Sequence, residues 1–190
     1  MSRSSRITEI KMLSSVQKNY PVQYESRFVL KDGKEVWIRP VLDTDEILIV
    51  DLSRRLSAES LYLRFLRPVS ALSKDLLFQL THLDYKNNFA LAAVIEEEGK
   101  DTIIGVARYG YESIDKVTDF AVLVRDDWQH CGLGKSLLLK IFAIGREHGI
   151  SRFVSIVDST NHIMKQTLRS LGYEVKYSYE DGFTQVEVFV

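Results

Sequence analysis

The sequence feature that most constrains the fold is QHCGLG, residues 129–134, which lies between a strand pattern and a helix pattern. FAVLV precedes it at 120–124, and the segment after it repeats apolar residues at helical spacing as far as Gly149. A turn of this kind brings backbone N–H groups and the positive end of a helix dipole to one corner. The chain is therefore expected to build α and β structure around an anion-binding loop, although the spacing alone also fits a purely structural turn.

Two common phosphate-binding motifs do not fit this loop. A nucleoside-triphosphate loop requires a glycine five positions before Gly134, and that position is Gln129. A dinucleotide-binding loop requires another glycine three residues after Gly134, and residue 137 is a leucine. What remains is a pair of glycines, Gly132 and Gly134, that opens a helix directly after a strand.

Composition narrows the classes of function. The chain has 190 residues, which suits one domain, and its 25 Lys and Arg against 26 Asp and Glu give no basic field for nucleic acid. The longest apolar run, FALAAVI at 89–95, is too short to cross a membrane, and the N-terminus does not resemble a secretory signal. With a single cysteine and four scattered histidines, we expect no disulfide, no metal site and a cytoplasmic protein without a membrane partner.

Residues 1–26 are expected to form an N-terminal arm, either one weak helix or disordered, followed by one domain over 27–190. The domain pattern begins with a hairpin around Asp32–Gly33, then two or three helices, of which Ser57 and Ser73 can cap two. Three strands, a helix, a strand, a helix and two strands complete the order. This predicts an α/β (α+β) fold with a mixed, mostly antiparallel sheet of six to seven strands flanked by helices.

The loop and its surroundings resemble the GNAT superfamily of N-acyltransferases. Gln129, Gly132 and Gly134 match the family's Q/R-x-x-G-x-G/A loop, which binds the pyrophosphate of an acyl-CoA, and Asn161 with Gly172–Tyr173 is similar to a second family segment. RLSAESLYLRF (55–65) and LTHLDY (80–85) resemble the acetyltransferase domains of bacterial Pat-type protein lysine acetyltransferases. The resemblance covers residues 27–190 and implies a GNAT domain that uses acetyl-CoA.

The resemblance also implies which residues contact acetyl-CoA. Backbone groups of the strand would pair with the acetyl carbonyl and the pantetheine amides, the loop would hold the pyrophosphate, and an asparagine amide would contact the pantetheine arm. In this chain these residues are Val122, Leu123, Val124, Gln129, His130, Cys131, Gly132, Leu133, Gly134, Lys135 and Asn161. The purely structural role of Asn161 would be that of a helix N-cap. Cys131 and His130 are expected to be side chains that the loop accommodates, and not catalytic groups.

Acetyl transfer to an amine needs a base, because an amine with a pKa of about 10.4 is almost wholly protonated near pH 7. Asp119 shares one face of the expected strand with Val117, Ala121 and Leu123, so its carboxylate projects from an apolar row. The resembled Pat-type domains carry a catalytic Glu at this position, which implies that Asp119 is the base, acting directly or through one water. Glu112, Asp115 and Glu174 are weaker substitutes.

Two further positions shape the hypotheses. Many family members place a tyrosine seven residues after the asparagine to protonate the leaving sulfur, and this chain has Leu168 there. Arg54, Arg55, Arg64 and Arg67 are expected to form a solvated basic flank.

The leading hypothesis is an N-acetyltransferase whose acceptor is a protein lysine. The alternatives are an acetyltransferase of a small amine and a CoA-binding sensor with weak catalysis, and the oligomeric state, a homo-oligomer included, stays open.

Overall fold

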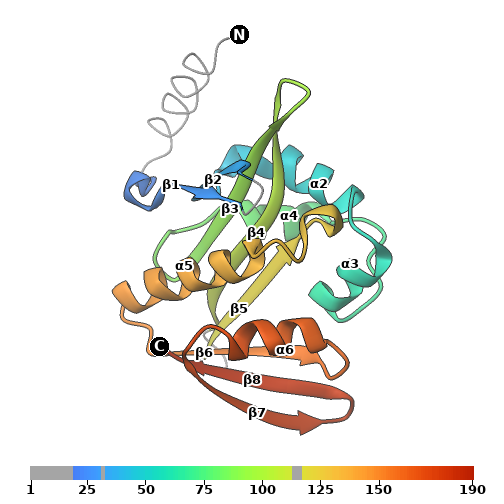
Figure 1. Ribbon diagram of the computed structural model, residues 1–190, viewed down its shortest axis with the longest axis vertical. Coiled ribbons are helices and arrows are strands. Elements are labelled where there is room, and N and C mark those ends of the chain that lie inside the picture. Colours follow the sequence, from blue (N-terminus) through green and yellow to red (C-terminus); the bar gives the residue numbers. More distant parts are fainter. Residues whose placement is uncertain (1–18, 31–32, 113–116) are drawn as a thin grey trace.

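The computed structural model describes residues 19–30, 33–112 and 117–190. Strands and helices alternate in groups along the chain (Figure 1). In order they are β1 (Ser26–Val29), β2 (Glu35–Pro40), α2 (Glu46–Arg54), α3 (Ala58–Phe65), α4 (Lys74–Thr81), β3 (Asn88–Glu97), β4 (Lys100–Glu112), β5 (Val117–Val124), α5 (Leu133–Glu147), β6 (Arg152–Asp158), α6 (His162–Arg169), β7 (Glu174–Glu180) and β8 (Phe183–Phe189).

The strands of the described residues form one sheet in the order β1-β2-β3-β4-β5-β6-β8-β7. Every neighbouring pair is antiparallel except β5 and β6, which run parallel. The mixed, mostly antiparallel sheet is confirmed, and its eight strands exceed the expected six to seven. The four-residue β1 pairs antiparallel with β2, as expected for the first hairpin.

The parallel pair is the point at which the sheet opens. β5 and β6 share a single register pair, Asp119 with Val154, and diverge beyond it. The last three strands form a separate lower sheet segment that turns away from β5, with α6 packed beside it (Figure 1). Among the described residues, no strand therefore pairs with this backbone edge over the C-terminal half of β5.

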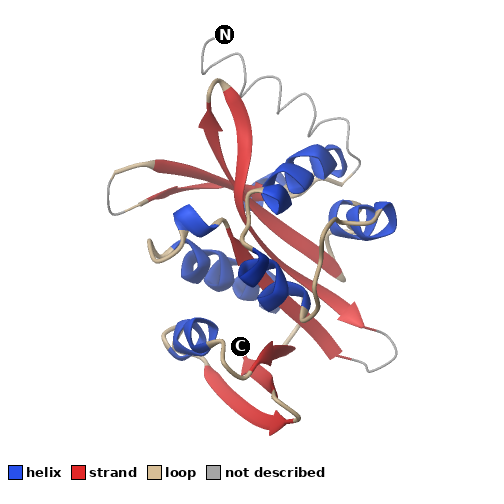
Figure 2. Ribbon diagram, turned by 90° about the vertical axis from the view of Figure 1, so that its right-hand side faces the viewer, coloured by secondary structure: helices blue, strands red, loops and turns tan. Residues whose placement is uncertain are grey.

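Helices cover both faces of the sheet, as the second view shows (Figure 2). The alternating residues of β3 show this directly, because Phe89, Leu91 and Ala93 belong to the core cluster under α5, whereas Ala90 and Ala92 belong to the cluster under α2. The continuous apolar run of β3 is thus explained by burial on both sides. α3 and α4 lie on the same side as α2.

Local sequence signals account for the helix boundaries. The hydroxyl of Ser57 accepts from the backbone N–H of Ser60, and that of Ser73 accepts from Leu76, so both expected N-caps are present. Gly149 follows the end of α5 with φ of 87°. Inside α5, Gly145 has no side chain because an added Cβ would overlap the ring of Phe153 on β6. This close approach fixes α5 against the sheet.

The expected N-terminal arm lies largely outside the described residues, as does Asp32 of the first hairpin turn. The described part before β1 packs on the domain, since the Tyr24 ring meets Phe89 edge-on at 5.3 Å and Tyr20 meets Tyr85 at 6.0 Å. Within the described residues, no helix combines the length and the hydropathy that a bilayer-spanning segment needs.

Candidate active site

The glycine-containing loop connects β5 to α5 through a short 3-10 turn, Asp126–Trp128. His130 and Gly132 both have positive φ, 59° and 88°, which turns the chain sharply into the helix. Gly132 is the N-cap of α5, no side chain caps this end, and the first turn carries no acidic residue. The first amides of α5 thus stay available to an anion, and the space where a Gly132 side chain would stand is open within 4 Å.

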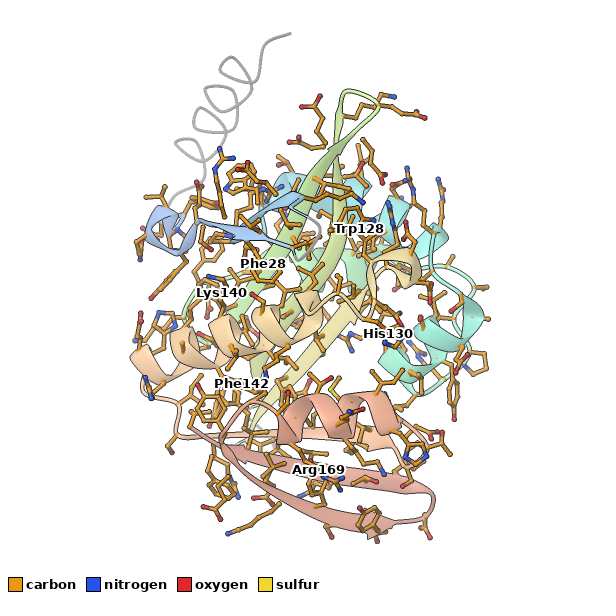
Figure 3. All side chains as sticks on the ribbon, in the orientation of Figure 1. Phe28, Trp128, His130, Lys140, Phe142 and Arg169 are labelled. Atoms are coloured by element: carbon orange, nitrogen blue, oxygen red, sulfur yellow. The ribbon has the colours of Figure 1, made fainter. Side chains whose placement is uncertain are left out.

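A cavity of about 340 Å³ begins at this corner and runs between β5, α3 and α6. Nine of the eleven residues expected to contact acetyl-CoA line it. They are Val122, Leu123, Val124, Gln129, His130, Gly132, Gly134, Lys135 and Asn161. His130 lies between the start of α5 and α3 (Figure 3), so its side chain stands at the side of this cavity and not in the core.

The other two expected residues direct their side chains elsewhere. Leu133 is 1% exposed and belongs to the core, and the Cys131 thiol donates to the Trp128 carbonyl oxygen at 2.9 Å. Neither residue lines the cavity. Lys135 lines the cavity, but its ammonium donates to the carbonyl oxygen of Ser170 at 2.7 Å and thereby ties α5 to the end of α6.

Gln129 holds the loop closed on itself. Its side-chain amide donates to the carbonyl oxygen of Val124 at 3.1 Å and to the Ser60 hydroxyl at 3.2 Å. The glutamine thus connects the end of β5, the loop and α3, and it leaves the corner lined with backbone amides.

The unpaired edge of β5 carries backbone groups that alternate in direction. Arg125 donates its N–H to Ile104 on β4, so by alternation the backbone of Leu123 also faces β4, whereas that of Val122 and Val124 faces the open side. Gln129 already occupies the Val124 carbonyl. The backbone N–H and C=O of Val122 are therefore best placed to pair with an extended amide-bearing ligand, and Leu123 offers only its side chain.

A second cavity, of about 280 Å³, adjoins the first and contains Asp119. The two cavities share five lining residues, from α3, β5 and α6: Leu63, Arg64, Val122, Asn161 and Met164. Asn161 also caps α6, since its Oδ1 accepts from the Met164 N–H at 3.0 Å. A ligand lying along β5 from the loop would thus reach the side of Asp119.

The environment of Asp119 suits a base. Part of the side chain is open to solvent, but protein surrounds the carboxyl on its other sides, and this desolvation raises its pKa above the ordinary value. The charges of Arg64 and Arg108 and a hydrogen bond from Ser155 oppose the rise without cancelling it. A carboxylate with a raised pKa that stands in a cavity matches the requirement for proton abstraction.

Two residues of this site were not anticipated. Arg64 was expected on a solvated basic flank, but it is only partly exposed and lines both cavities, because α3 packs over the end of β5. Arg108 on β4 faces the same side as Asp119, since Gly110 pairs with Asp119 and Ala121 pairs with Arg108. Alternation along β4 could have placed Arg108 on this face, whereas no local pattern indicates the position of Arg64.

The other candidate residues do not line the two cavities. The Glu174 side chain lies 3.4 Å from the Lys176 ammonium on the edge strand β7, and Leu168 is fully buried in the core. Asp115 and the side chain of Glu112 lie outside the described residues. Among the residues that the structure describes, no group of three or more His, Cys, Asp or Glu could hold a metal ion.

Comparison with known proteins agrees with this geometry. The model of the acetyltransferase (GNAT) family matches residues 56–173. An acetyltransferase of Pseudomonas aeruginosa is 30% identical over 157 residues, covering 83% of this chain and 84% of that protein. The crystal structure of the GNAT domain of S. lividans PAT has 32% identity and a TM-score of 0.82, covering 90% of this chain and all of that domain, 100%.

A second similar structure, a putative acetyltransferase from Salmonella typhimurium with its cofactor acetyl-CoA, has 18% identity and a TM-score of 0.61 over 80% of this chain and 91% of that one. At this identity the likeness concerns the fold alone. A sheet opened beside a glycine-lined helix start defines a class of acyl-CoA-dependent transferases. With more than half of its length matched by the family model, the chain belongs to the GNAT family of acetyltransferases and is an enzyme that uses acetyl-CoA.

Proposed function

We propose that this enzyme transfers the acetyl group of acetyl-CoA to a primary amine, with a protein lysine as the favoured acceptor. The observation that carries the proposal is the junction of the two cavities. One cavity leads from the loop along β5, and the other holds Asp119 on the far side of their shared wall. A donor and an acceptor that entered separately would meet at Val122 and Arg64.

In this proposal the corner binds the diphosphate of coenzyme A. Backbone amides at Gly132 and Gly134 and the α5 dipole supply the positive potential, with roughly half an elementary charge at the helix start. The pantetheine arm would follow the open edge of β5, where Val122 offers both a donor and an acceptor. The thioester then lies near the shared wall of the cavities, within reach of the acceptor side.

The amine nitrogen attacks the thioester carbonyl carbon, a C–N bond forms, and the C–S bond breaks. The ammonium first loses one proton to Asp119, directly or through one water, which frees the nitrogen lone pair for the attack, and Asp119 passes this proton to solvent. After the attack the nitrogen loses its second proton to solvent. Positioned proton transfer of this kind contributes about 10²–10⁴ in rate. The sulfur leaves as a thiolate, which a thiol with a pKa of about 8.5 permits, and takes a proton from solvent. Leu168 is buried and has no acidic proton to give.

Two observations favour a protein lysine over a small amine. The first is the similarity over 90% of the chain to the GNAT domain of S. lividans PAT, a name that the resembled protein lysine acetyltransferases share. The second is an exposed apolar side chain of the acceptor cavity, Ile156, which is 56% exposed. Apolar side chains exposed beside a site are typical of a surface that docks another protein.

The test supplies the purified protein with acetyl-CoA and either a complete protein extract or a panel of free amines. Acetyl-lysine is mapped by mass spectrometry, release of CoA thiol is followed in parallel, and acetyl-CoA binding is measured by calorimetry. We expect site-selective protein acetylation. Turnover with free amines alone would support the small-amine alternative, and binding of acetyl-CoA without turnover of any amine would support the sensor and contradict the proposal.

A further inference from the structure

Two arginines stand beside Asp119 without a carboxylate of their own. Arg108 extends along its strand over Gly110, the residue paired with Asp119, and its Nη2 lies 3.6 Å from the place where a Gly110 side chain would begin. Arg64 reaches the same place from α3. Within the described residues, no carboxylate oxygen lies within the 4.0 Å of an ion pair from either guanidinium. Asp119 influences both arginines from farther away.

The surroundings of Arg64 and Arg108 make it unfavourable to keep both side chains charged. Both arginines border an apolar hollow of about 40 Å³ between the sheet and the helices, lined by leucines such as Leu52 and Leu61, with room for about one water. Burial and the neighbouring Arg108 lower the pKa of Arg64 to about 10, with Asp119 opposing, so the group stays charged at neutral pH. Burial also lowers the pKa of Arg108. Two like charges are thus held together where water screens them poorly.

An anionic group between the arginines would remove this cost. Guanidinium groups bind carboxylates through paired, charge-assisted hydrogen bonds, which are about twice as strong as neutral ones. Asp119 cannot fill this role and also act as the base, because an ion pair with the arginines would hold its proton affinity down. A second carboxylate, supplied by the acceptor, satisfies both requirements.

We propose that the acceptor carries a carboxylate near its reactive amine, and that Arg64 and Arg108 bind this carboxylate beside Asp119. This inference rests on the proposed acetyl transfer and specifies its substrate class. The carboxylate comes either from an acidic residue next to a lysine in a protein or from an amino acid itself. A polyamine has no carboxylate, and its extra ammonium groups would be repelled by the two arginines, so it is a poor acceptor.

The experiment compares acceptors in matched pairs. One pair is a blocked peptide in which lysine is followed by glutamate or by glutamine, and the other is lysine against lysinamide, with spermidine as a cationic reference. We expect kcat/KM to be at least about 10-fold higher for the carboxylate member of one pair, equal to about 1.4 kcal/mol. The pair that shows the difference identifies the source, a protein segment or a free amino acid.

Variants then connect the preference to the arginines. Arg108→Gln should abolish the preference by slowing the carboxylate member about 10-fold while sparing the amide member, and Arg108→Lys should restore part of it. Arg108 does not line the acetyl-CoA cavity, so calorimetric acetyl-CoA affinity should be unchanged, which also shows that the variant is folded. Arg67→Gln, at an exposed residue outside the three cavities, is the control and should retain the preference.

Equal kcat/KM within both pairs for the wild-type enzyme would overturn this inference and leave the proposed acetyl transfer standing. Equal loss for both members of a pair in Arg108→Gln would also overturn it, because Arg108 would then act on the base or on the fold. Failure to acetylate any amine would instead contradict the proposed function, and this inference with it.

Discussion

The donor corner and the acceptor side of this enzyme are built by different means. The proposed donor corner comes from one continuous stretch, residues 122–135, and would bind through backbone groups that the glycines leave uncovered. The acceptor side joins Arg64 of α3, Arg108 of β4 and Asp119 of β5, which are far apart in sequence and work through charged side chains. Substrate binding at the donor corner should therefore be impaired by any added side chain. Activity at the acceptor side should instead depend on which side chains are present.

The donor corner should show the largest effect. Gly132→Glu forces a residue with a side chain into φ of 88° and places a negative charge where the diphosphate would bind. We expect acetyl-CoA affinity to fall at least about 1000-fold, or about 4 kcal/mol, by calorimetry.

Gly149→Glu is the matched control for this variant, because Gly149 has φ of 87° at the opposite end of the same helix. It should lose thermal stability to a similar degree and keep its affinity for acetyl-CoA. Unchanged affinity in Gly132→Glu would remove the diphosphate from this corner.

Asp119 should show the next largest effect, and on rate instead of affinity. Asp119→Asn cannot accept a proton, so kcat should fall by about 10² or more while acetyl-CoA binding is retained. Because desolvation raises the pKa of Asp119, the wild-type rate should fall with decreasing pH already above the ordinary range of an aspartate, near 3.9. This acid limb should be absent from the pH profile of the variant. An unchanged kcat across pH would exclude Asp119 as the base.

Asp126 connects the two regions, and its loss should affect both moderately. Its carboxylate accepts from the Ser57 N–H at 2.8 Å and from the Ser60 hydroxyl at 2.6 Å, which holds the start of α3 to the turn before the loop. In Asp126→Ala we expect KM for both substrates to rise by about 3- to 10-fold, roughly the value of one or two such hydrogen bonds. Substrate-specific KM values from initial rates provide the measurement.

The connection through Asp126 should also depend on pH. Burial raises the pKa of Asp126, but hydrogen bonds from Ser60 and Ser57 outweigh it, so the folded-state pKa is lowered. The stabilisation that the Asp126 carboxylate contributes is present at pH values above its pKa in the unfolded chain. It is lost as the pH falls through its pKa in the folded protein. Asp127→Ala is the control, because that neighbouring carboxylate pairs with Arg125. A rise in only one KM would show that Asp126 does not couple the regions.

Cys131 should show the smallest effect, although it lies inside the loop. Its thiol donates to the Trp128 carbonyl oxygen and does not line the acetyl-CoA cavity. Cys131→Ser keeps a donor of similar size, so the hydrogen bond, worth about 0.5–1.5 kcal/mol, is retained. We therefore expect kcat and KM to stay within about 2-fold of the wild type. A loss of activity above 10-fold would show that the donor corner depends on side chains as well as backbone.

Much of the secondary structure could be predicted because its signals are local. Ser57 and Ser73 cap helices through their own hydroxyls, and the continuous apolar run of β3 is typical of a strand that is buried on both faces. Gly132 indicated the loop for the same reason, since a backbone with positive φ next to a helix start is specified by the residue that adopts it. The sheet has eight strands, slightly more than the expected six to seven, and the mixed, mostly antiparallel arrangement is as predicted.

The residues alone thus determined the glycine-lined corner at the start of α5, the order of helices and strands, and a carboxylate on one face of β5. The tertiary structure decided what surrounds that carboxylate. It placed Arg64 over the end of β5 and Arg108 across Gly110, and it separated β5 from β6 after a single register pair. The physical reason is the sequence distance over which each feature is set. Backbone conformation depends on neighbouring residues, whereas the electrostatic environment of a side chain depends on which distant helices and strands pack around it.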